Sequence, residues 1–182
     1  MACSRILTGI AMECSPSKGG IIEAYVANWA EGIFKYDTDS GTTGDIEIPK
    51  TITGITDSGT TVWKKLAFRK NISNYTSTMN VDDANGVQYV STEINLVFNK
   101  MQTASRLAIA AMGLTGMAVI VKDANGKYWG FGADESVMLT AGTGESGTAA
   151  TDANHYSVTL TDTSAFLPME LTADAIAEIN VG

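Results

Sequence analysis

The sequence predicts a mainly β protein: an antiparallel β-sandwich or β-barrel with one flanking helix at residues 103–113 and a projecting ribbon or loop at residues 38–61. Three observations lead to this fold class. Apolar and polar residues alternate over many short segments, which is typical of half-buried strands. Glycine is abundant, with 18 residues, and short turn sequences recur. At 182 residues the chain suits a single domain, which we assign to residues 1–182.

Two turn sequences each occur twice. TDSGTT stands at residues 38–43 and 56–61, and DANG stands at residues 83–86 and 123–126. Asn-Gly and Ser-Gly steps supply the positive φ angles of tight turns. We therefore expect the DANG turns to close two antiparallel hairpins. These hairpins pair residues 73–81 with 87–98 and residues 117–122 with 127–132.

Alternation along the chain places the remaining strands. Ile94 and Leu96 occupy one side of a strand whose other side carries Glu93 and Asn95, and residues 156–161 alternate in the same way. Further strands are predicted at residues 21–27, 62–69, 137–140 and 167–171. Residues 141–154, rich in Gly, Ala and Thr, lack apolar periodicity and are predicted to form a loop.

Residues 44–55 lie between the two TDSGTT turns and carry Pro49, which cannot donate a hydrogen bond within a central sheet. Ile46 and Ile48 alternate around polar residues. We expect an edge strand or projecting ribbon that adds to a neighbouring subunit, with Ile46, Ile48 and Pro49 as contact candidates. The alternative is a surface loop with some strand character.

One segment has helical spacing. Thr103 stands where an N-cap belongs, and Gly113 stands at the C-terminal end. The predicted apolar stripe of this helix consists of Leu107, Ala110, Ala111 and Leu114. A short second helix is predicted at residues 172–179, starting at Thr172 or Asp174.

Charge is distributed unevenly along the chain. Residues 1–127 hold all 12 Lys and Arg together with an equal number of acids, whereas residues 128–182 hold acids and no base, so the net charge of -8 comes from the last segment. A single-sign field repels polyanions and orients partners. This pattern favours a role in assembly over a role in catalysis.

Residue types that commonly carry catalysis are scarce. His155 is the only histidine, and its position in the sequence favours a structural or exposed role over a zinc site or a Cys-His pair. The chain has no Gly-Lys-Ser/Thr triplet and no Gly-x-Ser-x-Gly motif. We therefore assign no catalytic, cofactor or metal residues and expect a protein that is not an enzyme.

One basic cluster consists of Lys64, Lys65, Arg69 and Lys70. Basic residues near aromatic ones can hold single-stranded nucleic acid, but a net charge of -8 opposes binding to phosphates. We expect these four residues to contact an acidic partner, for which the C-terminal third of this chain is the obvious candidate. A solvated strand is the alternative.

Several segments resemble the major tail (tail tube) proteins of tailed bacteriophages. These segments are LTGIAMEC at residues 7–14, NYTSTMNV at 74–81, VQYVSTE at 87–93, FNKM at 98–101 and AVIVKD at 118–123. The resemblance implies a β-sandwich or β-barrel with a flanking helix, assembled into hexameric rings that stack into a tube. It further implies a virion protein made in the host cytoplasm, with partners among other tail proteins and no membrane.

In such a tube DNA passes through without tight binding. DNA carries one negative charge per roughly 1.7 Å of its axis, so a basic wall would hold it and an acidic wall would let it slide. Acids expected at the bore or at a contact between rings are Asp134, Glu135, Glu145, Asp152 and Asp162.

Other readings stay open. The chain could be a head decoration or adaptor protein, a carbohydrate-binding β-sandwich that uses exposed aromatics, or an enzyme of unrecognised type. Cys3 and Cys14 are expected to be reduced thiols, although the sequence does not exclude a bridge between them.

Overall fold

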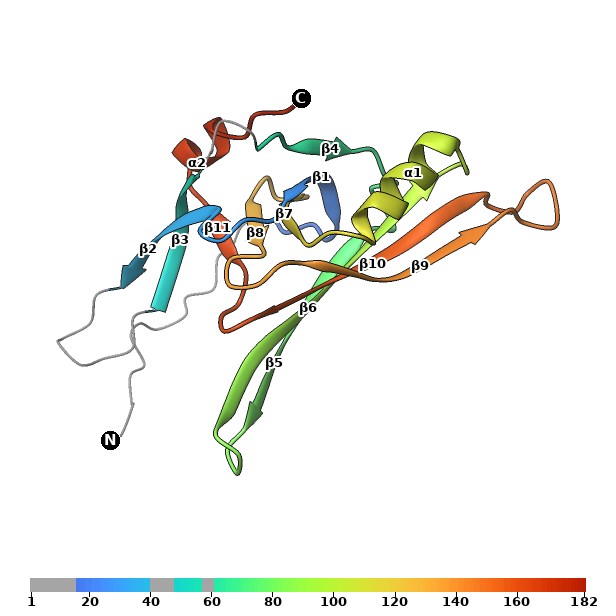
Figure 1. The fold of residues 1–182 in the computed structure, drawn as a ribbon. Helices are drawn as coiled ribbons and strands as arrows, with labels where there is room; N and C mark the ends of the chain where they lie inside the picture. Colours follow the sequence, from blue (N-terminus) through green and yellow to red (C-terminus); the bar gives the residue numbers. More distant parts are fainter. Residues whose placement is uncertain (1–15, 40–47, 57–60) are drawn as a thin grey trace.

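The computed structural model describes residues 16–39, 48–56 and 61–182. It contains two β-sheets in a sandwich-like arrangement and two helices, so the prediction of a mainly β protein is confirmed (Figure 1). The arrangement is a sandwich and not a closed barrel. The predictions for Cys3, Cys14 and Ile46 lie outside the described residues.

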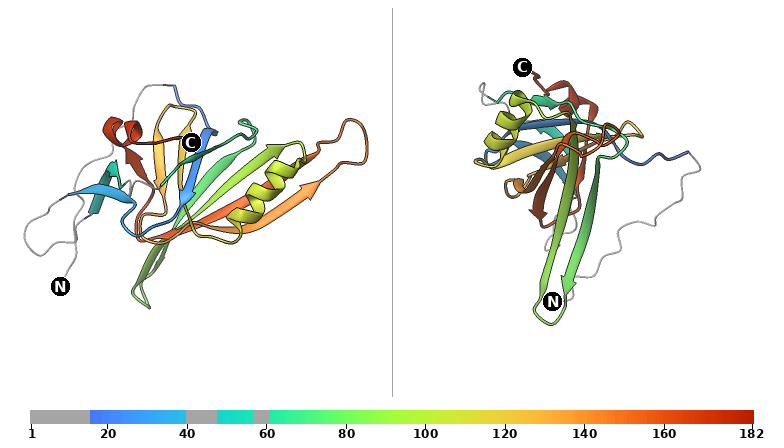
Figure 2. Two further views of the ribbon diagram at one scale, coloured as in Figure 1. Left: turned by 45° about the horizontal axis from the view of Figure 1, so that its top comes forward. Right: turned by 90° about the vertical axis from the view of Figure 1, so that its right-hand side faces the viewer.

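The smaller sheet has four strands in the order β5-β6-β10-β9, and all its neighbours are antiparallel. Its strands are β5 (Asn74–Asp82), β6 (Val87–Asn99), β9 (Met138–Glu145) and β10 (His155–Ser164). The predicted hairpin closed by the first DANG turn is β5–β6, which projects beyond the rest of the molecule (Figures 1 and 2).

The larger sheet has seven strands in the order β2-β3-β11-β8-β7-β1-β4. Only the β3–β11 pair is parallel among the described ladders. Its strands are β1 (Ile21–Asn28), β2 (Phe34–Asp39), β3 (Ile48–Ile55), β4 (Lys64–Leu66), β7 (Met117–Asp123), β8 (Tyr128–Phe131) and β11 (Met169–Leu171). The hairpin predicted at the second DANG turn is β7–β8.

The main hydrophobic core lies between the two sheets. From the four-stranded sheet, Ile94, Leu96 and Leu160 point into it with no exposed surface. From the seven-stranded sheet, Val119 and Val121 on β7 meet them and are equally buried. The predicted alternation at residues 93–98 and 156–161 therefore identified the side of each strand that faces this core.

A second core occupies the other face of the seven-stranded sheet. This sheet curls so that its two edges approach each other. The ring centroid of Phe34, on β2, lies 6.1 Å from that of Trp63, which is next to β4 at the opposite edge. Ile52 and Ile120 fill the space between them, and α2 (Ala173–Ala177) covers it with the fully buried Ala175. Strand β7 is consequently buried on both faces, which explains its unbroken apolar sequence.

Helix α1 (Thr103–Met112) forms where predicted, but it packs by a different face. Its N-cap is Gln102, not Thr103, and no side chain caps it. Met112 and Ile109 pack into the main core, whereas the predicted stripe faces solvent: Leu107 is 55% exposed and Leu114 is 85% exposed. The four predicted residues share one face of the helix, but their spacing alone does not show that this face packs inside the same chain.

Three other boundaries differ from the sequence-based expectation. Residues 141–145 continue β9, because backbone pairing with β10 does not require apolar side chains there. Glycine fits at position 144, where a Cβ would lie 2.8 Å from the Tyr156 ring. Strand β3 is an interior strand at Thr51 and Ile52, which pair on both sides, whereas its first and last residues pair with β2 alone. The strand predicted at residues 62–69 shortens to β4.

The second helix agrees with its prediction. Thr172 is the N-cap of α2, and its hydroxyl accepts a hydrogen bond from the Ala175 N–H at 3.4 Å. This helix packs on β3, and Glu178 just beyond it accepts the N–H of Ile55, the last residue of β3, at 2.5 Å.

Gly132 should be a stability determinant of the fold. It has φ +89°, and a Cβ there would lie 3.1 Å from the Met117 carbonyl oxygen and 3.3 Å from Ala118 Cα. We expect Gly132→Ala to lower the free energy of unfolding by about 2–3 kcal/mol, measured by urea denaturation. Gly126→Ala is the matched control, because Gly126 has φ +88° with open space around it, and should cost about 1 kcal/mol. Equal losses in both variants would contradict this account.

Candidate functional site

The face of the four-stranded sheet that points away from the core is the candidate functional surface. Because strand residues alternate, burial of Ile94 and Leu160 on one side places their sequence neighbours on the other. We call this surface the polar face. Its polar side chains come from Asn74, Thr76, Thr78, Asn80 and Asp82 on β5, Ser91, Glu93 and Asn95 on β6, Thr140, Thr143 and Glu145 on β9, and Ser157, Thr159, Thr161 and Thr163 on β10. The same side also carries Val87, Tyr89 and Val97 of β6 and Met138 of β9.

Hydroxyl and amide groups dominate the polar face and bond to one another across strands. The Thr159 hydroxyl donates to Asn95 Oδ1 at 2.8 Å, and the Thr140 and Thr161 hydroxyl oxygens lie 2.8 Å apart. These contacts fix side chains of neighbouring strands in one plane. The result is a neutral-to-acidic surface whose charged groups are the carboxylates of Glu93, Glu145 and, at the hairpin end, Asp82.

Basic residues in the structure are segregated by sheet, whereas acids occur in both sheets; the seven-stranded sheet contains Glu23, Asp37, Asp39, Asp123 and Glu170. In the described chain, none of the residues of β5, β6, β9 and β10 is Lys or Arg. The seven-stranded sheet carries Lys35, Lys50, Lys64, Lys65 and Lys122. The polar face therefore presents carboxylates without neutralising bases among its strands, and it would repel a polyanion lying along it.

The five acids proposed from the sequence occupy different places. Glu145 belongs to the polar face, where it pairs across strands with His155. Asp134 and Glu135 are exposed in the turn before β9, and Asp134 Oδ2 accepts the Ala165 N–H at 2.9 Å. Asp152 lies in the β9–β10 loop and accepts the Ala149 and Thr148 N–H groups, which lowers the pKa of its carboxyl.

Asp162 is not available to a bore or a ring contact, which corrects that prediction. It lies on the core side of β10, paired with Thr92, and is only 5% exposed. Its Oδ1 accepts the Gly132 N–H at 3.2 Å. The pKa of Asp162 is raised to about 6: burial raises it most, the hydrogen bond from Gly132 partly offsets this, and the nearby Asp134 and Glu135 add to the increase.

Glu93 is the acid that sequence reasoning missed as a site residue. It is exposed near the middle of the polar face, opposite Thr76 on β5 and Thr161 on β10. A count of charge along the sequence does not reveal Glu93, because residues 1–127 carry no net charge. The signal that finds it is the alternation with the buried Ile94.

His155 begins β10, across from Asn99 and Glu145. Its Nδ1 is buried and has no hydrogen-bond partner among the described residues. His155 is partly buried, which agrees with the structural role that its sequence position favours.

The proposed basic contact residues have partners inside the subunit or remain exposed. Lys65 Nζ pairs with Glu23 Oε1 at 2.9 Å, which lowers the pKa of Glu23, and Lys64 Nζ donates to the Gly182 carbonyl oxygen at 3.0 Å. Lys65 thus finds an acid of the N-terminal part instead of the C-terminal third. Arg69 and Lys70 are exposed in the β4–β5 connection, and their contact with a partner stays a prediction.

Both outer edges of the four-stranded sheet are open. In the part of the chain that the structure describes, β5 pairs only with β6, and β9 pairs only with β10. Of the ribbon candidates, Ile48 is 40% exposed and Pro49 half-buried, beside β2. Unpaired edges are templates for strand addition.

Comparisons with protein-family models, with curated proteins and with solved structures find no match to this chain. Among the described residues, no three His, Cys, Asp or Glu side chains gather closely enough to hold a metal ion. None of the helices in the same residues has the length and apolar content needed to cross a membrane.

The buried carboxyl of Asp162 predicts a defined pH dependence of stability. The folded state keeps the Asp162 proton up to a pKa of about 6, whereas an unfolded Asp loses it near 3.9. Folding therefore takes up a proton in this window, and the free energy of unfolding should fall as pH rises from about 4 to about 6. The loss amounts to ~3 kcal/mol at most.

Asp162→Asn keeps an oxygen for the Gly132 N–H and removes the titrating charge. We expect this variant to be more stable than wild type by about 1–3 kcal/mol at pH 7 and to lose the stability slope between about pH 4 and 6, measured by denaturant unfolding. Asp134→Asn, at an exposed carboxylate, is the control that should keep the slope. An unchanged slope in Asp162→Asn would contradict the prediction.

Proposed function

We propose that this chain is a structural subunit of a phage tail tube, in which copies form stacked, hexameric rings around a bore for DNA. The observation that carries the proposal is the polar face: a sheet face rich in Thr, Ser and Asn, with carboxylates, a few apolar or aromatic residues toward its ends, and no Lys or Arg in its four strands. Such a surface suits the inner wall of a conduit for a polyanion, because it offers no site of counterion release.

The open edges supply a route to the ring. Strand β5 forms one edge of the four-stranded sheet and β9 forms the other, so β9 of one copy can add to β5 of the next. This contact joins two different surfaces and is heterologous, and heterologous contacts close into rings when the rotation permits. Each addition would continue the polar face into the neighbouring subunit and remove both edges from solvent.

The phage resemblance adds to this argument because two of its segments, residues 74–81 and 87–93, lie in the β5–β6 hairpin of the same sheet. A head decoration or adaptor protein would share the strand content, but it does not require a base-free face of this extent.

A carbohydrate-binding role is less well supported. Trp63 is 1% exposed and packs against Phe34, and the Trp29 and Trp129 indoles donate to the Gly132 carbonyl and to Asp123 Oδ2. These described tryptophans serve the interior and the turns of the subunit. They do not form an exposed aromatic platform.

Assembly should protect the two open edges from hydrogen exchange. We expect backbone amides of β5 and β9 that exchange quickly in dilute, monomeric protein to slow by at least about tenfold in sedimented assemblies, because new ladder bonds form there. Amides of β6 and β10, already paired on both sides, are the internal control. Assemblies in which β5 and β9 exchange as fast as in the monomer would contradict edge pairing.

Lysines placed on the polar face should turn the wall into a DNA-binding surface. Thr76 and Thr159 lie on this face, so Thr76→Lys with Thr159→Lys should retain short duplex DNA in tubes assembled with it. We expect roughly tenfold more nuclease-protected DNA than in wild type, falling with added salt.

Thr53→Lys with Thr56→Lys adds the same two positive charges at exposed positions outside the four-stranded sheet, and serves as the control. These tubes should protect no more DNA than wild type. Equal protection by the wall variant and the control variant would place the polar face elsewhere than on the bore.

A further inference from the structure

The two ends of the four-stranded sheet differ in what they carry. Register places the β5–β6 turn next to the pair Asp82 and Val87, whereas Asn99, His155 and Glu145 meet at the opposite end. Helix α1 follows Asn99 and lies at this second end, beside β9 (Figures 1 and 2). A head-to-tail contact between copies along the strand direction would bring the turn of one copy to α1 of another.

The projecting end of the β5–β6 hairpin is apolar on its core side. Met79 is 46% exposed and Val81 is 66% exposed, although alternation places both on the same side as the buried Val90. The seven-stranded sheet does not extend far enough to cover them (Figure 1). Exposed apolar side chains on the core side of a sheet indicate a surface that another molecule covers.

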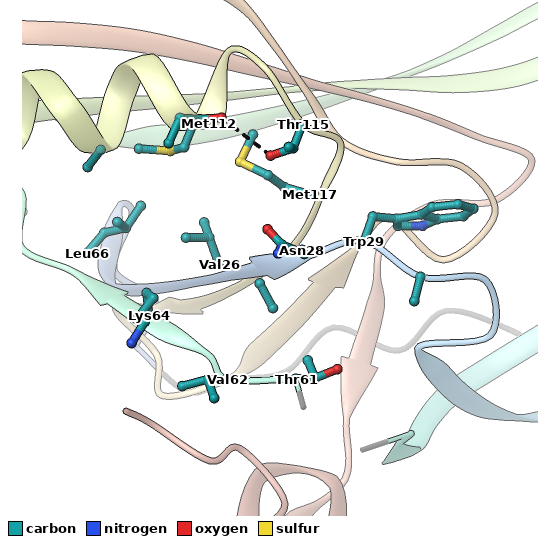
Figure 3. A pocket seen from close by; sticks show the side chains of 14 residues that line it. Val26, Asn28, Trp29, Thr61, Val62, Lys64, Leu66, Met112, Thr115 and Met117 are labelled. Atoms are coloured by element: carbon teal, nitrogen blue, oxygen red, sulfur yellow. Dashed lines mark hydrogen bonds between the residues drawn. The ribbon is translucent and has the colours of Figure 1, made fainter. Parts of the chain in front are cut away.

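Helix α1 has a matching apolar surface. The exposed stripe of Leu107, Ala110, Ala111 and Leu114 runs along it and continues, through Ala111, into a groove between α1 and strands β1 and β4. This groove has a volume of about 730 Å³, and Val26, Leu66 and Met117 line it together with Met112 (Figure 3). The groove is large enough to hold several side chains of another molecule.

The two segments that would meet carry opposite charges, although the acids Glu145 and Asp152 also lie toward the α1 end of the sheet. The hairpin end, residues 78–90, carries Asp82 and Asp83 and no base, whereas residues 99–116 around α1 carry Lys100 and Arg106 and no acid. Asp82 is engaged in the turn, where it accepts the Ala84 and Asn85 N–H groups. Asp83 is the exposed acid that can face a neighbour.

We propose that the end of the β5–β6 hairpin of one copy docks on the exposed stripe of α1 in a second copy, with Met79 and Val81 against Leu107 and Leu114. The proposal rests on the proposed ring stacking and names the surfaces that make the contact along the tube axis. The contact is heterologous, so each copy offers a hairpin at one end and a helix at the other, and stacking continues without limit.

Charge reversal tests the pairing of these ends. Asp83→Lys and Arg106→Glu should each weaken association by about three- to tenfold, measured by sedimentation velocity, and the two changes in one chain should restore it. Asp37→Lys is the control for the first change, because it makes the same alteration at an exposed residue of β2, outside both docking surfaces. Single variants that assemble like wild type, or a double variant no better than either single, would overturn the proposal.

Cysteine crosslinking tests the contact itself. In a Cys3→Ser, Cys14→Ser background, Val81→Cys with Leu107→Cys should give a ladder of oxidised oligomers, whereas either cysteine alone should give at most dimers. Assemblies that form but yield no ladder would overturn the hairpin–helix contact and leave the proposed function standing. A wild-type chain that stays monomeric at all concentrations would overturn both.

Discussion

Packing of the two sheets against each other is the constraint on which the rest of the structure depends. Ile94, Leu96 and Leu160 are fully buried against Val119 and Val121, and each such side chain contributes about 1.5–3 kcal/mol. Because side chains alternate, this packing also sets the register of β6 and β10, and a slip by one residue would turn the polar face inward. The core therefore fixes which residues the subunit offers to its surroundings.

Charge follows from the same constraint. The sequence shows an acidic C-terminal segment, yet in the folded chain several of those acids serve the subunit: Asp162 accepts the Gly132 N–H, Glu178 accepts the Ile55 N–H, and Glu170 pairs with Lys127. The electrostatic field that a partner would meet arises because the two sheets carry different charged residues. One sheet carries lysines, and the other presents Glu93 and Glu145 among hydroxyl groups.

Much of the fold could be predicted from alternation and turns, because both are local properties of the chain. The β5–β6 and β7–β8 hairpins, α1 and α2 follow from them. The continuation of β9 through Gly142 and Gly144 could not, since pairing with β10 decides it. Helical spacing places Leu107 and Leu114 on one apolar stripe of α1, but it does not show whether that stripe packs inside the same chain. For the site, Glu145 was identified, whereas Glu93 requires knowing that four strands share one polar face.

The central claim is that the polar face becomes the continuous inner wall of a ring by pairing of β5 with β9 of a neighbour. A cryo-electron microscopy map of the assembled protein tests it most directly. The account predicts a bore lined by Thr76, Glu93 and Thr159, with unbroken strand density crossing each subunit boundary. A map in which the polar face lies on the outer surface, or in which β5 and β9 stay unpaired between subunits, would contradict it.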